Sequence, residues 1–329
     1  MSDDALITVA IPTLNGSRHL VETLRGVLSQ DDVRFDLILS DDRSTDETLD
    51  LAMVAAGDRV KIAVNSERLG LAGNWNRCVS LSRTPLVAVI HQDDVLRPGH
   101  LAAHVRAFQT ASSVGFVASA SQVIDGQGRP VPGSVIDPGG LGPVDRTFAA
   151  GESLPVLAAG NPLRCSAVSI RAAAHADVGG FDPSYRYVVD WEFWLRLARR
   201  WSLTWLANPS VDVRWHTASE THRFRGGVAD LEETERVLEG LRVDRDGHPV
   251  LTGEFAGLAC RRLSRAYLNR AHVALRGGDG RLGRDCLKRA VRTWPGILRL
   301  IVADPRLAAQ MAAVWVAPGA SGRLFARSE

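Results

Sequence analysis

The chain has 329 residues, and its net charge of +2, its 45% share of hydrophobic residues and its mean hydropathy of −0.03 are those of a soluble globular protein. This composition excludes an intrinsically disordered chain, whereas so small a net charge excludes no class of partner. The length permits one large α/β domain with an appendage.

The N-terminus and the cysteines indicate the compartment. Residues 1–12 lack the basic start and the apolar stretch of a secretory signal peptide. No segment reaches the roughly 18 consecutive apolar residues of a membrane-spanning helix. Cys78, Cys165, Cys260 and Cys286 lack the spacing of a zinc site or a disulfide framework, so we expect buried free thiols and no redox chemistry. The sequence therefore predicts a cytoplasmic protein.

Short apolar runs alternate with helical patterns over the first hundred residues. The expected order is a strand at 6–11, a helix at 17–29, a strand at 35–39, a helix that starts near Thr45, a strand at 60–64, a helix at 74–82 and a strand at 86–90. This alternation predicts a parallel sheet with helices on its faces, whose ligands bind beyond the carboxyl ends of the strands. Two acidic pairs, Asp41-Asp42 and Asp93-Asp94, lie at such ends.

The two pairs suit different chemistry. Adjacent carboxylates repel each other unless a cation lies beside them, so Asp93 and Asp94 favour Mg²⁺ or Mn²⁺, which would complete its shell with diphosphate oxygens and water. A solvated turn is the alternative. One carboxylate of Asp41 and Asp42 can accept hydrogen bonds from a nucleobase N–H or a ribose hydroxyl. Capping or turn formation explains this pair equally well.

The middle of the chain contains a long loop and a third acidic position. Gly and Pro make up 10 of the 21 residues from 126 to 146, which predicts a long mobile loop. A strand at 167–170 and a helix at 190–200 follow. Asp190 starts this apolar helix, where desolvation would raise its pKa and make it a general base, although helix capping is an equal alternative. Glu192 is the reserve candidate.

Further aromatic and basic residues surround this position. Five of the eight Trp residues lie between Trp191 and Trp215, and we favour packing over sugar stacking for each of them. Arg214 lies within a strand-like run at 211–215 and His216 follows it, so the two could bring a cation or an imidazole to a diphosphate or a metal. A lone histidine is more often structural, so both interpretations of His216 stay open.

The C-terminal hundred residues are predicted to be helical, with helices over 258–275 and 282–292. Between Arg261 and Arg306 there are 12 basic and 3 acidic residues. Such a segment could lie on an anionic membrane surface or bind nucleic acid, and a solvated helical face is the more ordinary interpretation.

Residues 6 to about 220 resemble the family 2 inverting glycosyltransferases of GT-A fold. The matching segments are 9–15, 37–46, 65–76, 91–94, 179–182 and 190–196. The resemblance implies a mixed α/β sheet flanked by helices, with a nucleotide-sugar-binding half at 1–110 and an acceptor-binding half at 111–225. A helical C-terminal extension at 226–329 lies outside the family pattern.

The resemblance also implies roles for individual residues. It makes Asp190 the catalytic base and Asp94 a metal ligand, with Asp93 at the ribose or the metal. The residues themselves, apart from the resemblance, add His216 as a candidate metal ligand and Glu192, Trp191 and Arg214 as candidates for the acceptor or the diphosphate. On the donor side the resemblance implies that Pro12 and Thr13 border the base and that Asp42 contacts it. Asn15, Asp41, Asn74 and Asp93 complete the residues that we expect to bind the donor. Three positions depart from the usual pattern: Arg43 replaces a glycine, Gln92 precedes two acids in place of an Asp-x-Asp motif, and Val189 replaces a glutamate.

The activity implied by the resemblance is transfer of a sugar from a UDP- or dTDP-sugar to an acceptor hydroxyl, with metal assistance and inversion of configuration. The acceptor would be a glycan, a lipid-linked molecule or a small molecule, with peripheral contact to the inner face of the membrane and no nucleic acid. A dinucleotide-dependent oxidoreductase is disfavoured because Gly-x-Gly-x-x-Gly is absent after the first strand. A non-catalytic nucleotide-sugar or glycan-binding protein on the same fold is the alternative.

Overall fold

The computed structural model describes residues 5–131, 140–216, 227–241 and 253–303. The chain divides into two compact units. The N-terminal unit comprises residues 1–157 and 161–223, and the C-terminal unit comprises residues 158–160 and 224–329. Part of the predicted loop at 126–146, residues 132–139, lies outside the described residues.

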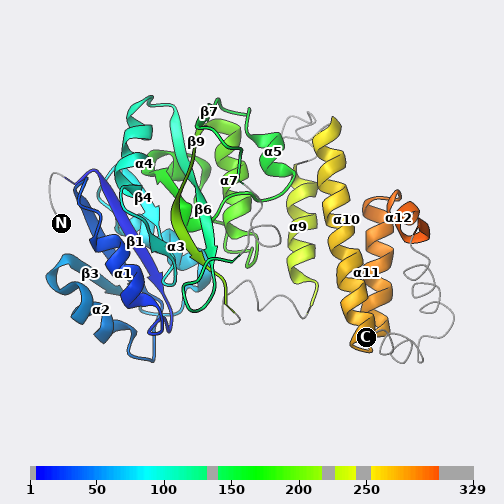
Figure 1. Cartoon of the computed structure of the whole chain (residues 1–329), viewed down its shortest axis with the longest axis horizontal. Helices are drawn as coiled ribbons and strands as arrows, with labels where there is room; N and C mark the ends of the chain where they lie inside the picture. Colours follow the sequence, from blue (N-terminus) through cyan, green and yellow to red (C-terminus); the bar gives the residue numbers. More distant parts are fainter. Residues whose placement is uncertain (1–4, 132–139, 217–226, 242–252, 304–329) are drawn as a thin grey trace. The chain divides into compact units, whose positions relative to one another are not determined.

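The N-terminal unit is built on a nine-stranded mixed sheet with the order β3-β2-β1-β4-β8-β6-β9-β5, and β7 pairs with β9 (Figure 1). The first four strands are parallel to one another and confirm the predicted alternation. They are β1 (Ile7–Thr13), β2 (Phe35–Asp41), β3 (Val60–Val64) and β4 (Leu86–Val89). Because they are parallel, their carboxyl ends meet at one edge of the sheet.

The second half of the sheet reverses direction at β8. This half contains β5 (Val95–Leu96), β6 (Val114–Ile124), β7 (Arg146–Phe148), β8 (Val168–Arg171) and β9 (Ser202–Arg214). β8 lies antiparallel between β4 and β6, which makes the sheet mixed and confirms the predicted fold class. β6 was not predicted because Ala, Ser and Gln interrupt its apolar run, and only the last part of β9 was predicted.

Helices cover both halves of the sheet. They are α1 (Leu20–Leu28), α2 (Thr48–Ala56), α3 (Gly70–Leu81), α4 (His100–Gln109), α5 (Leu154–Ala158), α6 (Ala172–Val178) and α7 (Val189–Arg200), with short 3₁₀ turns at Gly57–Arg59 and Cys165–Ala167. Alternate residues of β1 pack with α1 and α4 in the core, as shown by Ile7, Val9, Ile11, Leu24, Val27, Leu101, Val105 and Phe108. The same face of the sheet therefore carries α1 and α4.

Side chains from distant loops set where two helices start. α1 begins three residues later than predicted because the Gly16 amide donates to Thr48 Oγ1 and the Ser17 amide donates to Asp46 Oδ2. α3 begins four residues earlier than predicted because the Asp42 carboxylate accepts from the amides of Leu69 and Gly70. Carboxylates at a helix N-terminus satisfy amides that have no partner within the helix.

Two histidines of α4 are fully buried against the sheet. His100 Nδ1 lies 2.8 Å from Ser210 Oγ, His104 Nδ1 lies 2.8 Å from Ser169 Oγ, and the ring centroids are 4.0 Å apart. Within the described residues, the Nε2 atom of each ring has no hydrogen-bond partner. Burial lowers the pKa of His100 to about 3 and, together with the His100 charge, lowers that of His104 well below its usual value.

This buried pair predicts acid sensitivity of the fold. In the unfolded chain the two histidines take up protons near pH 6.5, whereas in the folded chain they do so only at much lower pH. The free energy of unfolding is therefore highest above pH 6.5 and falls as the pH decreases. Each histidine contributes a loss of about 2 kcal/mol between pH 6.5 and 5. Urea unfolding at pH 5, 6 and 8 measures this slope, and His104→Gln should make it shallower. An identical slope in the variant would contradict the assignment.

The C-terminal unit is helical, as predicted. It contains α9 (Ala229–Gly240), α10 (Gly253–Arg276), α11 (Gly280–Thr293) and α12 (Ile297–Ala303). Acids of α9 pair with arginines of α10 and α11: Asp230 with Arg270 at 2.7 Å, and Glu235 with Arg289 at 3.1 Å and Arg292 at 2.5 Å. Three of the basic residues counted from Arg261 onward, Arg270, Arg289 and Arg292, are therefore paired with acids of the helix that precedes them. Among the described residues, none of the helices combines the length and apolarity needed to cross a membrane.

Candidate functional site

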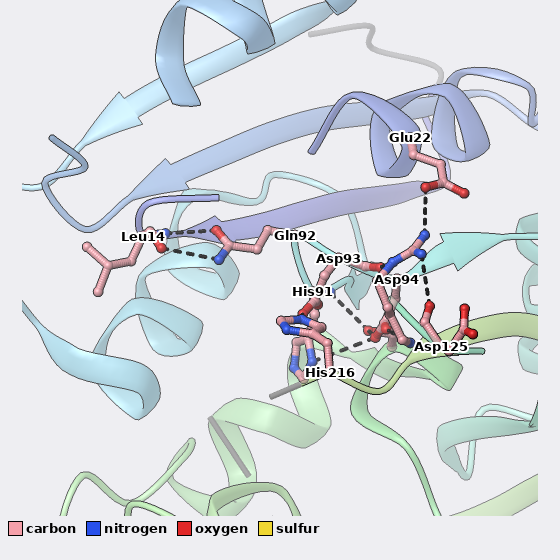
Figure 2. Close-up of polar contacts among 10 residues, drawn as sticks. Leu14, Glu22, His91, Gln92, Asp93, Asp94, Asp125 and His216 are labelled. Atoms are coloured by element: carbon pink, nitrogen blue, oxygen red, sulfur yellow. Dashed lines mark hydrogen bonds and ion pairs between the residues drawn. The ribbon is translucent and has the colours of Figure 1, made fainter. Parts of the chain in front are cut away.

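The loops after β1 and β4 are joined by one side chain. Gln92 Oε1 accepts from the Leu14 amide at 2.9 Å, and Gln92 Nε2 donates to the Leu14 carbonyl at 3.2 Å (Figure 2). A Cβ atom at Gly16 would lie 2.3 Å from Gln92 Oε1, so glycine is needed beside this contact. Gln92, which departs from the usual pattern, thus fixes the loop that carries Asp93 and Asp94.

Asp93 and Asp94 lie side by side and are held by different partners (Figure 2). Asp94 is only 2% exposed; its Oδ1 accepts from the Arg214 amide at 2.8 Å and its Oδ2 from Ser166 Oγ at 2.5 Å. Asp93 is half-buried, and its Oδ2 lies 2.9 Å from His216 Nε2. The structure therefore brings His216, predicted from sequence, to the acidic pair.

The electrostatics of this pair favour a cation. Burial, and then the charge of Asp93, raise the pKa of Asp94. Burial would also raise the pKa of Asp93, but the His216 hydrogen bond and the neighbouring His91 and His216 imidazoles hold it below its ordinary value. The ligand atoms of His91, Asp93 and Asp94 all lie within 4.8 Å of one another. Two carboxylates and an imidazole in this arrangement fit a divalent cation.

Arg214 is a buried cation that braces the site. Its Nε donates to the Asp93 carbonyl at 3.0 Å, its Nη1 to the Asp125 carbonyl at 3.2 Å, and its Nη2 to Glu22 Oε2 at 2.6 Å. These contacts join α1, the acidic loop and the end of β6 (Figure 2). Each of the three guanidinium nitrogens of Arg214 thus donates a hydrogen bond to a protein group.

Asp190 lies in the first turn of α7, close to the same site. Its Oδ1 accepts from the Trp191 amide at 2.7 Å and its Oδ2 from Asn161 Nδ2 at 3.2 Å. Burial raises its pKa, partly opposed by the Trp191 hydrogen bond and the His91 imidazole. After burial, Asp190 and Asp94 both raise the pKa of the Cys165 thiol. The charges of Asp190 and Asp94 therefore both act on the buried Cys165 thiol, so the two carboxylates lie on the same side of the protein as that thiol.

Comparison with known proteins assigns this arrangement to a family. The family model of glycosyl transferase family 2 matches residues 8–164, which include both acidic pairs. The protein MT1568 of Mycobacterium tuberculosis (strain CDC 1551 / Oshkosh) is 32% identical over 261 residues, covering 73% of this chain and 76% of that protein. This chain belongs to glycosyl transferase family 2.

Further relatives and solved structures agree with this assignment. The PGL/p-HBAD biosynthesis glycosyltransferase of Mycobacterium bovis (strain BCG / Pasteur 1173P2) is 25% identical over 243 residues, covering 72% of this chain and 84% of that protein. Residues 1–349 of S. aureus TarS in complex with UDP-GlcNAc match with a TM-score of 0.62 at 13% identity, covering 98% of this chain and 90% of that one. The mannosyltransferase PcManGT from Pyrobaculum calidifontis, in complex with GDP-Man and Mn²⁺, matches with a TM-score of 0.55 at 15% identity, covering 97% and 85%. The two structures show the shared fold.

The residues predicted to bind the donor of this glycosyltransferase fall into two groups. Asp41, Asp42 and Asn74 are buried and satisfied by protein groups: Asp41 Oδ1 accepts from Thr13 Oγ1 at 2.9 Å, Asp42 binds the start of α3, and Asn74 Nδ2 donates to the Ser40 carbonyl at 2.9 Å. Pro12 is half-buried and Asn15 is exposed. The first group shapes the edge of the sheet, and the contact of each residue with a donor stays a prediction.

The residues predicted at the acceptor side of the glycosyltransferase are engaged by the protein. Glu192 forms an ion pair with Arg196, with Oε1 2.7 Å from Nε. Trp191 is 5% exposed, and its indole N–H donates to the Leu157 carbonyl at 2.7 Å. Glu192 is thus neutralised and Trp191 packs in the interior, whereas Asp190 is paired with no cation among the described residues.

Three residues of the site, His91, Ser166 and Asn161, were not predicted from the sequence. His91 stood in the His-Gln-Asp-Asp motif, so its signal was present, although only the acids received a role. Ser166 and Asn161 come from the segment between α5 and β8, where isolated polar residues gave no signal. Ser166 lies 72 positions from Asp94 in the sequence and Asn161 lies 29 positions from Asp190, so both contacts form only in the folded chain.

Proposed function

We propose that this glycosyltransferase moves a sugar from a UDP- or dTDP-linked donor to an acceptor hydroxyl, with metal assistance and inversion of the anomeric configuration. The observation that carries the proposal is the convergence of His91, Asp93 and Asp94 at the carboxyl edge of the sheet, with Asp190 near enough for the His91 charge to act on its carboxylate. The structures of TarS with UDP-GlcNAc and of PcManGT with GDP-Man and Mn²⁺ support a nucleotide-sugar donor.

Asp93 and Asp94 would hold the cation, either Mg²⁺ or Mn²⁺. Such a cation neutralises the negative charge that develops on a leaving diphosphate. Ser166 and the Arg214 amide orient Asp94, and His216 orients Asp93. Because the Arg214 guanidinium binds three protein groups, we assign it to bracing this loop rather than to the diphosphate.

Asp190 would act as the general base. Its raised pKa brings the carboxylate closer to the basicity needed to accept a proton from a sugar hydroxyl. Asn161 and the Trp191 amide hold its two oxygens in place. The acceptor oxygen, as it loses its proton to Asp190, attacks the anomeric carbon on the face opposite the diphosphate, which inverts the configuration. The ion pair of Glu192 with Arg196 disfavours that residue for the same role.

The proposed division of labour assigns the donor to residues 1–110 and the acceptor to residues 111–225. The acceptor is a glycan, a lipid-linked molecule or a small molecule. To test the reaction, the protein is incubated with UDP-, dTDP- and GDP-sugars and Mn²⁺, and release of the nucleoside diphosphate is followed by ³¹P NMR. The configuration of the transferred or hydrolysed sugar is read by ¹H NMR before mutarotation. Release without inversion would reject the single displacement.

We also propose peripheral membrane contact through the C-terminal unit. Short helix α12 exposes Leu298 (48%), Leu300 (38%) and Val302 (73%) around the exposed Arg299. Apolar side chains next to basic ones suit an anionic bilayer surface. The protein should sediment with phosphatidylglycerol vesicles at low salt, and Val302→Asp should reduce the bound fraction severalfold.

Val54→Asp is the matched control for this experiment, since Val54 is 85% exposed on α2 of the other unit. Absence of sedimentation of the wild-type protein with the anionic vesicles would support a solvated helical face.

A further inference from the structure

The imidazole of His91 lies directly beside the acidic pair (Figure 2). Its Nδ1 is 3.7 Å from Asp94 Oδ2. Among the described residues, its Nε2 is buried and has no hydrogen-bond partner. Two atoms bound about 2.1 Å from one cation lie up to about 4.2 Å apart. Small side-chain rotations would therefore bring the ligand atoms of His91, Asp93 and Asp94, now within 4.8 Å of one another, around a single ion.

The position of His91 is fixed from two sides. Its backbone N–H donates to Ser166 Oγ at 2.9 Å, and the same hydroxyl donates to Asp94, so one serine aligns both residues. Its ring stacks on Trp75 with centroids 5.2 Å apart and an interplanar angle of 26°. Trp75 is itself 3% exposed and packs edge-to-face against Phe181 at 5.1 Å. A ligand held in this way loses little conformational freedom when it binds.

His91 differs from His216 in what it contacts. His216 Nε2 is hydrogen-bonded to Asp93 Oδ2 at 2.9 Å, as expected of a residue that orients a carboxylate ligand. His91 makes no side-chain hydrogen bond within the described residues, and its Nδ1 to Asp94 distance is too long for one. Both rings keep one nitrogen without a hydrogen-bond partner among the described residues, Nε2 in His91 and Nδ1 in His216. They differ at the carboxylates: the His216 nitrogen that faces Asp93 is taken up by a hydrogen bond, whereas the His91 nitrogen that faces Asp94 lies beyond hydrogen-bond distance.

We propose that His91 is a direct ligand of the cation and that its nitrogen makes the site prefer Mn²⁺ to Mg²⁺. This proposal rests on the metal-assisted function above. Mg²⁺ prefers oxygen ligands in an octahedral shell and gives up water reluctantly. Divalent first-row transition metals accept imidazole nitrogen more readily. The carboxylate oxygens of Asp93 and Asp94 can bind either ion, so the third ligand decides which of the two is preferred.

The test measures Mn²⁺ binding to the full chain by the EPR signal of free Mn²⁺, with Mg²⁺ as the competitor, with and without UDP. His91→Asn should weaken Mn²⁺ binding by about tenfold or more, while Mg²⁺ binding changes by less than about threefold. Electron spin-echo modulation from imidazole ¹⁴N should be present in the wild-type protein and in His216→Asn, and absent in His91→Asn. His175→Asn, which removes a histidine bonded to Asn76 outside the site, is the matched control.

The outcomes separate this inference from the proposed function. Wild-type Mn²⁺ affinity and ¹⁴N modulation in His91→Asn, together with loss of Mn²⁺ in Asp94→Asn, would overturn the role of His91 and leave the metal site standing. Unchanged Mn²⁺ binding in both variants would overturn the metal-assisted function itself. Equal losses of Mn²⁺ and Mg²⁺ affinity in His91→Asn would overturn the selectivity.

Discussion

Asp94→Asn should abolish metal-dependent sugar transfer while the protein stays folded. The carboxylate supplies charge to the cation, and charge stabilisation by such an ion is worth several kcal/mol, so kcat/KM should fall by about 10³ or more. The fold should survive because an amide at this position still accepts from the Arg214 amide and lies beside Ser166 Oγ. It also removes the repulsion between Asp93 and Asp94 that raises the pKa of Asp94.

Initial rates over a range of Mn²⁺ concentrations, together with thermal unfolding, measure both parts of this prediction. Asp177→Asn is the matched control, because Asp177 pairs with Arg200 at 2.8 Å and takes no part in the site. Activity of the wild-type protein that persists in a chelator would remove the metal from the mechanism.

Asp190→Asn should lower kcat by about 10² or more and leave donor binding intact, as expected for loss of a general base. An asparagine keeps the hydrogen bond from the Trp191 amide, so α7 should retain its first turn. The asparagine has no basic oxygen to take the acceptor proton. Single-turnover rates and the Kd of the nucleoside diphosphate separate the chemical step from binding.

Glu192→Gln distinguishes the two acids of α7. This variant loses the ion pair with Arg196, so its stability should fall modestly while kcat changes by less than about threefold. A large drop in kcat in Glu192→Gln with normal turnover in Asp190→Asn would reverse the assignment. A change in donor affinity alone in Asp190→Asn would move that residue from catalysis to binding.

The parallel half of the sheet was predictable because its signals are local. The apolar runs that form β1 to β4 are continuous in the sequence, and the acidic pairs follow directly. The start of α3 was not predictable, since it depends on the carboxylate of Asp42 reaching Leu69 and Gly70 across the sheet edge. The neutralising pairs between α9 and the later helices were missed for the same reason, as Asp230 and Arg270 meet only in the folded unit.

The acids of the candidate site were predictable, but two of their partners, Ser166 and Asn161, were not. Asp93, Asp94 and Asp190 stand in recognisable motifs, whereas Ser166 and Asn161 are single polar residues whose importance comes from the residues they contact. Arg214 was predicted from its charge and its place near the end of a strand-like run. Its burial and its three contacts with protein groups became visible only in the structure.

The central claim is a metal-dependent nucleotide-sugar site at the carboxyl edge of the sheet, and thermal unfolding with a panel of nucleoside diphosphates and their sugars tests it most directly. A ligand that binds only the folded protein raises the free energy of unfolding by about 2.7 kcal/mol at a hundredfold excess over Kd. We predict a rise in Tm with the nucleotide of one base, larger with Mn²⁺ than without it and lost in Asp94→Asn. No rise with any nucleotide, or an equal rise with and without Mn²⁺, would contradict the claim.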